Sequence, residues 1–255
     1  MRGTALVTGG ASGIGRAIVR RLAAEGMTLL VVDVDEPAGR EVASEVGGAF
    51  VRADVSSTRD WEHLAGEAGP LRLACLNAGV GTATADVTEL SDEEYRRVLG
   101  VNVDGVVFGV RALAPLLEGG GGIVATASLA GLVPIDGDPI YGLTKHAVIG
   151  FVRSVAPQLE RRGIAITAVC PGIADTPLVG AAARAQLDAA GFPLLQPEEV
   201  AGAVVVAAES GQTGQAWVCQ PGREPLQFRF PNVPGPRTPG AEGLRPPVDA
   251  EAFTR

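Results

Sequence analysis

Apolar residues of this chain gather in seven short runs that do not alternate with polar positions. Such runs are typical of strands that are covered on both faces, as in a parallel sheet. They lie at residues 4–8, 28–33, 49–53, 73–77, 122–127, 164–170 and 215–219. Segments with the spacing of amphipathic helices separate them, at residues 13–25, 37–46, 57–67, 91–117, 139–162 and 197–209. This alternation predicts an α/β fold of the Rossmann type, a doubly wound parallel sheet of about seven strands with helices on both faces.

Local signals refine this outline. Ser91, with Glu94 three residues later, predicts a capping box at the start of a helix. Pro157 falls inside the last long helix but one, where it should cost about 3 kcal/mol or produce a kink. Beyond Cys219 eight prolines follow and no amphipathic period remains. We therefore expect one domain over residues 1–219 and a proline-rich tail over 220–255 that covers the surface or a neighbouring subunit.

Composition narrows the class of protein. A chain of 255 residues can bury a core without disulfides. The net charge of −8 argues against a nucleic-acid partner. The first residues lack a signal-peptide pattern and no apolar stretch reaches the length of a membrane span, so we expect a cytoplasmic protein without membrane contact. Three dispersed cysteines favour buried thiols, and no cluster of side chains has metal-ligand spacing.

A glycine-rich turn follows the first predicted strand and leads into a helix. Its sequence from Thr8 is TGGASGIG. Glycines let the chain turn tightly and bring backbone N–H groups against a pyrophosphate, where the helix N-terminus adds favourable partial charge. The alternative is a purely structural turn, but the strand-turn-helix context favours a dinucleotide. The candidate binding residues in this turn are Gly9, Ser12, Gly13, Ile14 and Gly15.

Asp33 ends the second predicted strand, about twenty residues after the glycines. An acidic side chain there can accept hydrogen bonds from an adenosine ribose diol and would repel a 2′-phosphate. No arginine lies beside it to compensate, so NAD is favoured over NADP. The alternative is an ordinary turn residue at the end of a strand.

The chain contains a single lysine, Lys145, against twenty arginines, and it follows Tyr141 by four residues. Residues at this spacing share a helix face. An ammonium beside a phenol favours the phenolate and moves the tyrosine pKa toward neutrality. A surface pair is the alternative, although arginine would serve as well there. Ser128, after the fifth predicted strand, could donate to a substrate oxygen or could simply form a turn.

With these residues in view, the sequence from about residue 4 to 219 resembles the single-domain short-chain dehydrogenase/reductase family. The segment from Thr8 to Gly15 resembles its glycine motif, and Asn102, Ser128, Tyr141 and Lys145 resemble its catalytic tetrad. Other stretches resemble its adenine-contacting acid, its Asn-Ala-Gly motif and the segment that meets the nicotinamide. They are Asp54 with Val55, then Asn77, Ala78 and Gly79, and finally Pro171, Gly172, Ile173 and Thr176.

The resemblance implies hydride transfer between the nicotinamide of NAD and a secondary alcohol or its ketone. Tyr141 would be the general acid/base, and Lys145 would lower its pKa and hold the cofactor ribose. Ser128 would orient the substrate oxygen, and Asn102 would anchor a water that relays protons from Lys145. Family analogy also implies a homodimer or homotetramer.

The segment around Ser128 and Tyr141 locally resembles the branch that contains 15-hydroxyprostaglandin dehydrogenase. Asp138 stands where that branch would place an amide near the substrate hydroxyl. A substrate loop is expected at residues 173–196, and the candidate pocket residues are apolar, which suits a hydrophobic alcohol. They are Leu129, Leu132, Val133, Ile135, Phe192, Leu194 and Leu195, of which about half could be core.

Two other functions remain open. A catalytically idle NAD-binding scaffold or sensor would share the fold, although it would have no need for the lone lysine. A sugar-nucleotide epimerase or dehydratase on this fold usually needs a larger C-terminal substrate domain than the residues after Cys170 provide.

Overall fold

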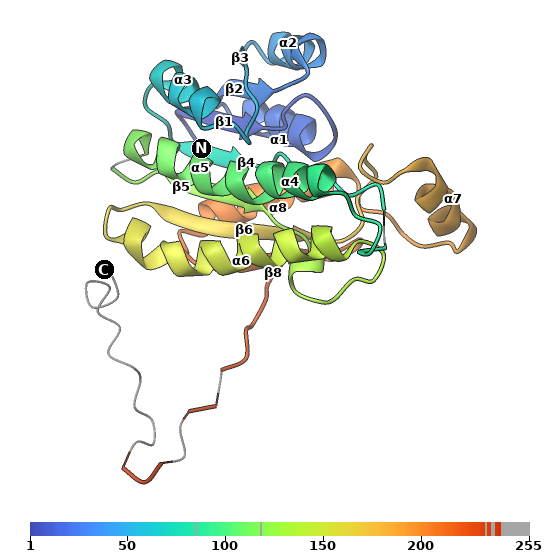
Figure 1. Cartoon of the computed structure of the whole chain (residues 1–255). Helices are drawn as coiled ribbons and strands as arrows, with labels where there is room; N and C mark the ends of the chain where they lie inside the picture. Colours follow the sequence, from blue (N-terminus) through green and yellow to red (C-terminus); the bar gives the residue numbers. More distant parts are fainter. Residues whose placement is uncertain (85, 118, 233, 236–237, 241–255) are drawn as a thin grey trace.

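A single twisted sheet forms the centre of the molecule (Figure 1). The computed structural model describes residues 1–84, 86–117, 119–232, 234–235 and 238–240. Within them the sheet has eight strands in the order β3-β2-β1-β4-β5-β6-β7-β8. The strands are β1 (Thr4–Thr8), β2 (Thr28–Asp33), β3 (Ala49–Arg52), β4 (Leu73–Leu76), β5 (Gly122–Thr126), β6 (Ala165–Pro171), β7 (Ala216–Cys219) and β8 (Leu226–Gln227). Because β1 to β7 are parallel, the predicted doubly wound Rossmann fold is confirmed.

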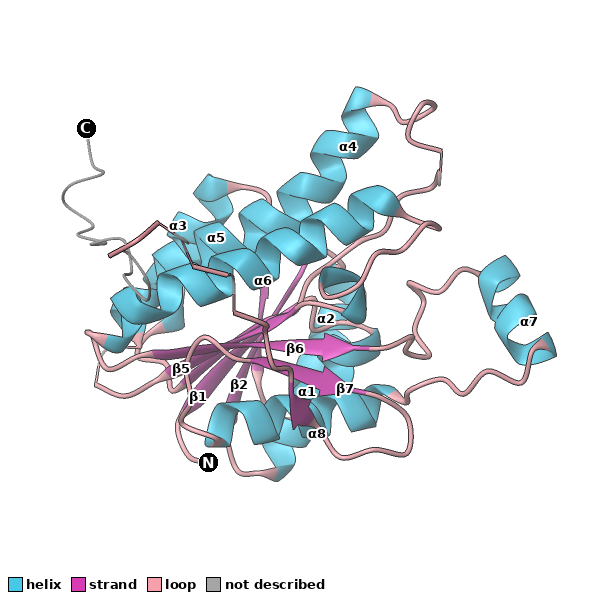
Figure 2. Ribbon diagram, turned by 90° about the horizontal axis from the view of Figure 1, so that it is seen from below, coloured by secondary structure: helices cyan, strands magenta, loops and turns pink. Residues whose placement is uncertain are grey.

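Helices cover both faces of the sheet (Figure 2). One apolar core contains residues of α3 (Thr58–Ala68), α5 (Gly105–Leu113) and α6 (Pro139–Glu160). The other contains residues of α1 (Gly13–Ala24), α2 (Glu36–Glu45) and α8 (Pro197–Glu209). Along β1 the side chain of Leu6 enters the first core, and those of Ala5 and Val7 enter the second. Continuous apolar strands are therefore required, because each face of the sheet is buried.

The helix predicted at residues 91–117 is interrupted. The structure has α4 (Asp92–Leu99), a π-helical turn at Gly100–Asp104, α5, and a short 3-10 turn at Ala114–Leu116. The helical period continues on both sides of this single π-turn, so the pattern of residues indicated one unbroken helix. The capping box at Ser91 is half present. Its hydroxyl accepts from Glu94 N, but the Glu94 carboxylate accepts from Ala83 N instead of from the cap.

Two elements in the C-terminal half of the chain, α7 (Ala181–Ala189) and β8, were not predicted from the sequence. Helix α7 lies in the expected substrate loop, projects from the body and has no buried residue (Figure 1). Strand β8 adds an eighth, antiparallel strand to β7 at the edge of the sheet. Helix α6 continues past Pro157 to Glu160 without a break.

The start of the tail packs on the body. Phe228 and Phe230 meet edge to face, with ring centroids 4.9 Å apart, and pack against the core on the α6 side. The Arg153 guanidinium of α6 lies 3.8 Å from the Phe230 ring centroid. These residues at the start of the predicted tail thus contact the body, while residues 241–255 lie outside the described part, so the role of the tail stays a prediction.

One helical stretch among the described residues, Asp92–Leu116, is long and apolar enough to pass a composition test for a membrane span. Half of its apolar window is buried inside the fold. Core helices of soluble proteins share this property, so the stretch gives only weak evidence for a membrane.

Candidate active site

A cavity of about 830 Å³ opens at the carboxyl ends of the parallel strands. This is where the doubly wound topology places ligands, next to the point at which the strand order reverses between β1 and β4. Most residues predicted to bind cofactor or substrate line this one cavity. They are Gly9, Ser12, Gly13, Ile14, Asp33, Asp54, Val55, Asn77, Ala78, Gly79, Ser128, Leu129, Asp138, Tyr141, Lys145, Pro171, Gly172, Ile173, Thr176 and Phe192. Gly15 and Asn102 are not among the lining residues.

The glycine turn is locked to the strand beside it. Gly9 has φ 64° and a Cβ there would lie 2.9 Å from the Ala78 Cα. The Asn77 amide donates to Thr8 O at 3.2 Å, and Asn77 N donates to Thr8 Oγ1 at 2.9 Å. Helix α1 begins at Gly13 with no side-chain cap and no acidic residue in its first turn. Its first N–H groups therefore lack a competing side-chain acceptor, so the turn fits an anionic group such as a pyrophosphate.

Gly15 does not line the cavity but lies behind it, against the backbone of Gly9. A Cβ at this position would lie 1.9 Å from Gly9 O and 2.8 Å from the Asn77 Nδ2. We expect Gly15→Ala to lower the free energy of unfolding by about 1–3 kcal/mol and to weaken NADH binding, because the turn must move away from α1. Urea unfolding and NADH fluorescence titration measure the two effects.

The matched control is Gly66→Ala in α3, where an added Cβ meets nothing within 4 Å. In a helix interior this change should stabilise the chain by about 0.5–1 kcal/mol. A Gly15→Ala variant as stable and as tightly binding as wild type would show that the close approach is not needed.

Asp33 already serves the turn before any ligand is considered. Its Oδ2 accepts from Ala11 N at 3.0 Å, and its Oδ1 accepts from Asp35 N at 3.1 Å. Each carboxylate oxygen retains a second lone pair for a ribose hydroxyl. Arg16, in the first turn of α1, forms an ion pair with Glu45 on α2. Within the described part of the chain, Asp33 therefore faces the cavity with two backbone N–H partners and no ion pair.

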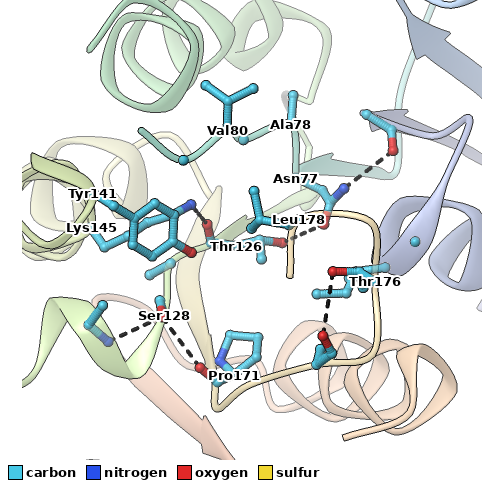
Figure 3. A pocket seen from close by; sticks show the side chains of 18 of the residues that line it. Asn77, Ala78, Val80, Thr126, Ser128, Tyr141, Lys145, Pro171, Thr176 and Leu178 are labelled. Atoms are coloured by element: carbon cyan, nitrogen blue, oxygen red, sulfur yellow. Dashed lines mark hydrogen bonds between the residues drawn. The ribbon is translucent and has the colours of Figure 1, made fainter. Parts of the chain in front are cut away.

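Tyr141 and Lys145, side by side on α6, and Ser128, after β5, line the same cavity (Figure 3). The Ser128 hydroxyl lowers the pKa of the Tyr141 phenol, and its Oγ donates to Pro171 O at 3.5 Å and accepts from Ala130 N at 3.1 Å. Lys145 Nζ lies 5.4 Å from the centroid of the Tyr141 ring and donates to Thr126 O at 2.9 Å. Helix α6 presents Tyr141 and Lys145 one turn apart, and Ser128 follows the end of β5, so the expected grouping is present in space.

Burial dominates the ionisation of this group. It raises the pKa of Tyr141, while the Ser128 hydroxyl lowers it and the Asp138 carboxylate raises it. Burial also lowers the pKa of Lys145 from 10.5 to about 8. The lowering of the tyrosine pKa expected from Lys145 is not seen in the chain alone. The ammonium lies beside Thr126 O, over the ring, and is itself desolvated.

Asn102 is fully buried in the π-turn, and both the oxygen and the nitrogen of its side-chain amide form hydrogen bonds. Its Oδ1 accepts from Val80 N at 2.8 Å, and its Nδ2 donates to Val80 O at 2.8 Å and to Thr144 Oγ1 at 3.0 Å. The structure thus places Asn102 behind the wall of the cavity. One lone pair of its oxygen remains for the water that the family resemblance implies.

The far end of the cavity is apolar. Of the predicted pocket residues, Leu129, Val133, Ile135 and Phe192 line it. Leu195 is fully buried in the core that contains α1 and α8, and Leu132 packs against the core that contains α6. These two residues therefore fit the alternative that they belong to the core. Leu194 is not among the lining residues.

Several lining residues escaped the sequence analysis. They are Val34, Ala53, Val80, Gly81, Thr82, Val101, Thr126, Ala127, Ala130, Ala174, Pro177, Leu178, Val179 and Gln220. Thr126 accepts from Lys145 Nζ through its backbone oxygen, and such a bond leaves no motif in the sequence. Leu178 could have been found, because it is apolar, half exposed and close to Thr176 in the expected substrate loop.

Comparison with known proteins identifies the family. Residues 3–187 match the short chain dehydrogenase family. A cyclohexanol dehydrogenase of Acinetobacter sp. is 37% identical over 211 residues, which cover 77% of this chain and 84% of that protein. A solved short chain dehydrogenase/reductase family protein superposes with a TM-score of 0.78 at 32% identity, covering 85% of this chain and 94% of that one. The chain belongs to the short-chain dehydrogenase/reductase family, and so to a class of oxidoreductases.

A further relative is longer than this chain. The uncharacterized short-chain type dehydrogenase/reductase y4vI of Sinorhizobium fredii is 33% identical over 98% of this chain, but only 49% of that protein is matched. The chain therefore spans about half the length of this relative.

Proposed function

We propose that the protein is an NAD-dependent oxidoreductase that transfers a hydride between the nicotinamide and a hydrophobic secondary alcohol or its ketone. The observation that carries this proposal is the meeting of Tyr141, Ser128 and Lys145 in the same cavity as the glycine turn. Turns of this kind bind pyrophosphates, and a phenol beside an ammonium is suited to proton transfer.

The cofactor supplies hydride donation and acceptance when it is bound. Tyr141 would donate the proton to the substrate oxygen in reduction and remove it in oxidation. The Ser128 hydroxyl, which lines the same cavity and lowers the pKa of the phenol, would hold the same oxygen. Lys145 would favour the phenolate through its charge and offer its two remaining N–H donors to ribose hydroxyls, since one already goes to Thr126 O. Pro171, Gly172, Ile173 and Thr176 would border the nicotinamide end.

Asp33 supports the choice of NAD. We expect wild type to prefer NADH over NADPH by about 100-fold, because a 2′-phosphate beside a carboxylate costs several kcal/mol. Asp33→Ala combined with Val34→Arg should reduce or reverse this preference, since Val34 is exposed at the cavity edge. Ratios of kcat/KM for the two cofactors measure it.

Asp33→Asn is the matched control, because an amide keeps one acceptor for the bond from Ala11 N. A melting temperature close to wild type would show that the turn is intact. Equal use of NADH and NADPH by wild type would remove Asp33 from cofactor selection.

The substrate end supports an uncharged, apolar substrate. Leu129, Val133, Leu178 and Phe192 line it, and Asp138 is its one carboxylate among the described lining residues outside the adenosine end. A carboxylate substrate would meet this charge, whereas a cyclic alcohol meets mainly apolar side chains. The similar Acinetobacter protein is named for cyclohexanol, which is a substrate of this chemical class.

A panel of hydrophobic ketones with NADH tests the proposal. Oxidation of NADH by at least one cyclic ketone, followed by its fluorescence, would support the enzyme. Tight binding of NADH without turnover of any ketone would favour the idle scaffold or sensor instead. Loss of NADH binding altogether would contradict both.

The proposal extends to organisation. Residues 1–219 would form the catalytic domain with its substrate loop at 173–196, and 220–255 the tail. A cytoplasmic homodimer or homotetramer is part of the same proposal. The three cysteines, Cys75, Cys170 and Cys219, are buried as free thiols, which suits a reducing compartment.

A further inference from the structure

The main chain of Tyr141 is tied to a distant segment by a closed ring of hydrogen bonds. The segment, residues 80–84, follows β4 and is called the wall loop here. Val80, Gly81 and Thr82 of this loop line the cavity. The family motifs assign no role to this connection between Tyr141 and the wall loop.

Asp138 forms one side of the ring. As the N-cap of α6, it accepts from Tyr141 N through Oδ1 at 2.8 Å. Through Oδ2 it accepts from Thr82 N at 2.9 Å. One carboxylate therefore holds both the first turn of the catalytic helix and the wall loop, although Asp138 and Thr82 are 56 positions apart in the sequence.

Asn102 and Thr144 form the other side. Thr144 Oγ1 donates to Tyr141 O at 2.8 Å and accepts from Asn102 Nδ2 at 3.0 Å. Asn102 then bonds to both the N–H and the C=O of Val80. The peptide groups on both sides of Tyr141 are thus linked to the wall loop, at Thr82 through Asp138 and at Val80 through Asn102.

The wall loop is also held from outside the cavity. Arg97 on α4 donates to Gly81 O at 2.9 Å, and Glu94 on the same helix accepts from Ala83 N. An added Cβ at Gly81 would lie 3.4 Å from the Asp138 Oδ2 and 3.8 Å from the Leu178 Cδ1. Asp138 therefore also lies close to the apolar substrate end.

We propose that Asp138 is a positioning residue that couples the wall of the substrate cavity to the placement of the Tyr141 phenol. This inference rests on the proposed function, in which Tyr141 is the group that exchanges the proton. A substrate that packs against the wall loop would then hold the tyrosine in place through Asp138. The carboxylate would act on the reaction without touching the reacting atoms.

The chemistry of the side chain supports this role. An ionised carboxylate is only an acceptor and offers two oxygens, which match the two backbone N–H groups that it meets. An asparagine would accept from one of them and turn its own NH₂ toward the other. A serine can cap Tyr141 N but is too short to offer a second acceptor to Thr82. Asn and Ser therefore preserve the helix cap and remove the connection to the wall loop.

Charge gives the same residue a second measurable effect. The charged side chains facing Tyr141 are Lys145 on α6 and Asp138 at the cap. The wall loop contributes no ionisable side chain, Glu94 and Arg97 bind its outer side, and the buried Cys170 thiol on β6 has its pKa raised to about 12, so it stays neutral. Removing the Asp138 charge should lower the pKa of Tyr141, because that carboxylate raises it.

The test compares Asp138→Asn and Asp138→Ser with Asp136→Asn in the full-length protein. Asp136 is exposed two residues away and does not line the cavity, so its variant removes the same charge without the bonds. Amide hydrogen exchange of residues 80–84 reads the connection without using activity. The KM for a cyclic alcohol and the pH profile of its oxidation read the coupling to Tyr141.

Both Asp138 variants should exchange the Thr82 amide about 10-fold faster than wild type, since one hydrogen bond is lost. The KM should rise about 5-fold to 10-fold with a smaller change in kcat, and the rising limb of the pH profile should move to lower pH. Asp136→Asn should leave all three unchanged. Wild-type exchange at Thr82 in both Asp138 variants would overturn the connection. Faster exchange with an unchanged KM and pH profile would overturn the coupling.

Failure of the proposed function would look different. If wild type oxidised no alcohol with NAD, the exchange measurement would still decide whether Asp138 holds the wall loop. An equal shift of the pH profile in Asp136→Asn would also overturn the proposal, because it would assign the effect to net charge and not to position.

Discussion

Replacing Tyr141 by phenylalanine should lower kcat about 1000-fold while NADH binds as in wild type. The change removes only the phenol oxygen, so the proton that the substrate oxygen gains or loses has no positioned donor or acceptor, and such groups contribute about 10²–10⁴-fold. The ring would still fill the space against Lys145 and the wall of the cavity. Steady-state kinetics with a cyclic ketone and fluorescence titration with NADH separate the two effects.

The chain offers a matched control in its other tyrosine. Tyr95 lies on α4, is 37% exposed and does not line the cavity, so Tyr95→Phe should leave kcat unchanged. Turnover of Tyr141→Phe within a few-fold of wild type would remove the phenol from the mechanism. Loss of NADH binding in the same variant would show that the ring supports the cofactor site and would leave the proton transfer unassigned.

Much of this fold could be predicted because its strands are buried on both faces. The limits of β1 and β2 match the predicted apolar runs, since a continuous run must end where the cover of helices ends. Helix α7 was missed because it has no buried residue and hence no apolar face to reveal it. The π-turn around Asn102 was missed because a widened turn keeps the helical period on either side.

The candidate site was predictable where chemistry needs particular residue types at the ends of parallel strands. Ser128 and Asn77 follow β5 and β4, and Tyr141 with Lys145 starts the next helix, so topology alone brings them together. Bonds through the backbone were not predictable. The hydrogen bond that Thr82 N donates to Asp138 depends on a loop conformation that no residue pattern specifies.

The direction in which the pKa of Tyr141 shifts could not be predicted from the sequence either. A lysine four residues from a tyrosine predicts a lowered phenol pKa only if both groups keep comparable hydration. In the structure burial raises the pKa of Tyr141 and lowers that of Lys145 to about 8, so desolvation outweighs the attraction in the chain alone. Anionic and hydroxyl groups of a bound dinucleotide would add hydrogen-bond partners for the ammonium, which favours its charged form.

Lys145→Met should make the protein more stable at pH 7 and nearly inactive. The side chain is 3% exposed, and its ammonium donates a hydrogen bond to Thr126 O. A pKa lowered from 10.5 to about 8 means that folding at neutral pH must bury a charge. That shift corresponds to about 3 kcal/mol, from which the lost bond to Thr126 O takes about 1 kcal/mol. Methionine has similar length and no charge, so we expect a gain of about 2 kcal/mol in the free energy of unfolding, measured with urea.

The pH dependence of this gain provides the sharper test. Between about pH 8 and 10.5 the lysine of the unfolded chain binds more protons than that of the folded chain. The free energy that wild type loses by burying a charge therefore disappears as the pH rises through this window. Buried thiols act in the opposite direction, because burial raises the pKa of Cys75 and Cys170 to about 12, and their stabilising effect is lost above pH 9. Burial alone raises the pKa of Cys75, so this thiol cancels in the difference between Lys145→Met and wild type, whereas Cys170 loses the charge of Lys145 that lowers its pKa. Up to about pH 9, the usual pKa of a thiol, the difference therefore reports the lysine. The advantage of the variant should shrink from pH 8 upward, vanish at about pH 9.5 and become a deficit of about 1 kcal/mol near pH 10.5, where only the lost bond to Thr126 O remains. A constant difference across this range would show that Lys145 is not a buried ammonium, and the reason for a lone lysine beside Tyr141 would have to be sought in the bound cofactor instead.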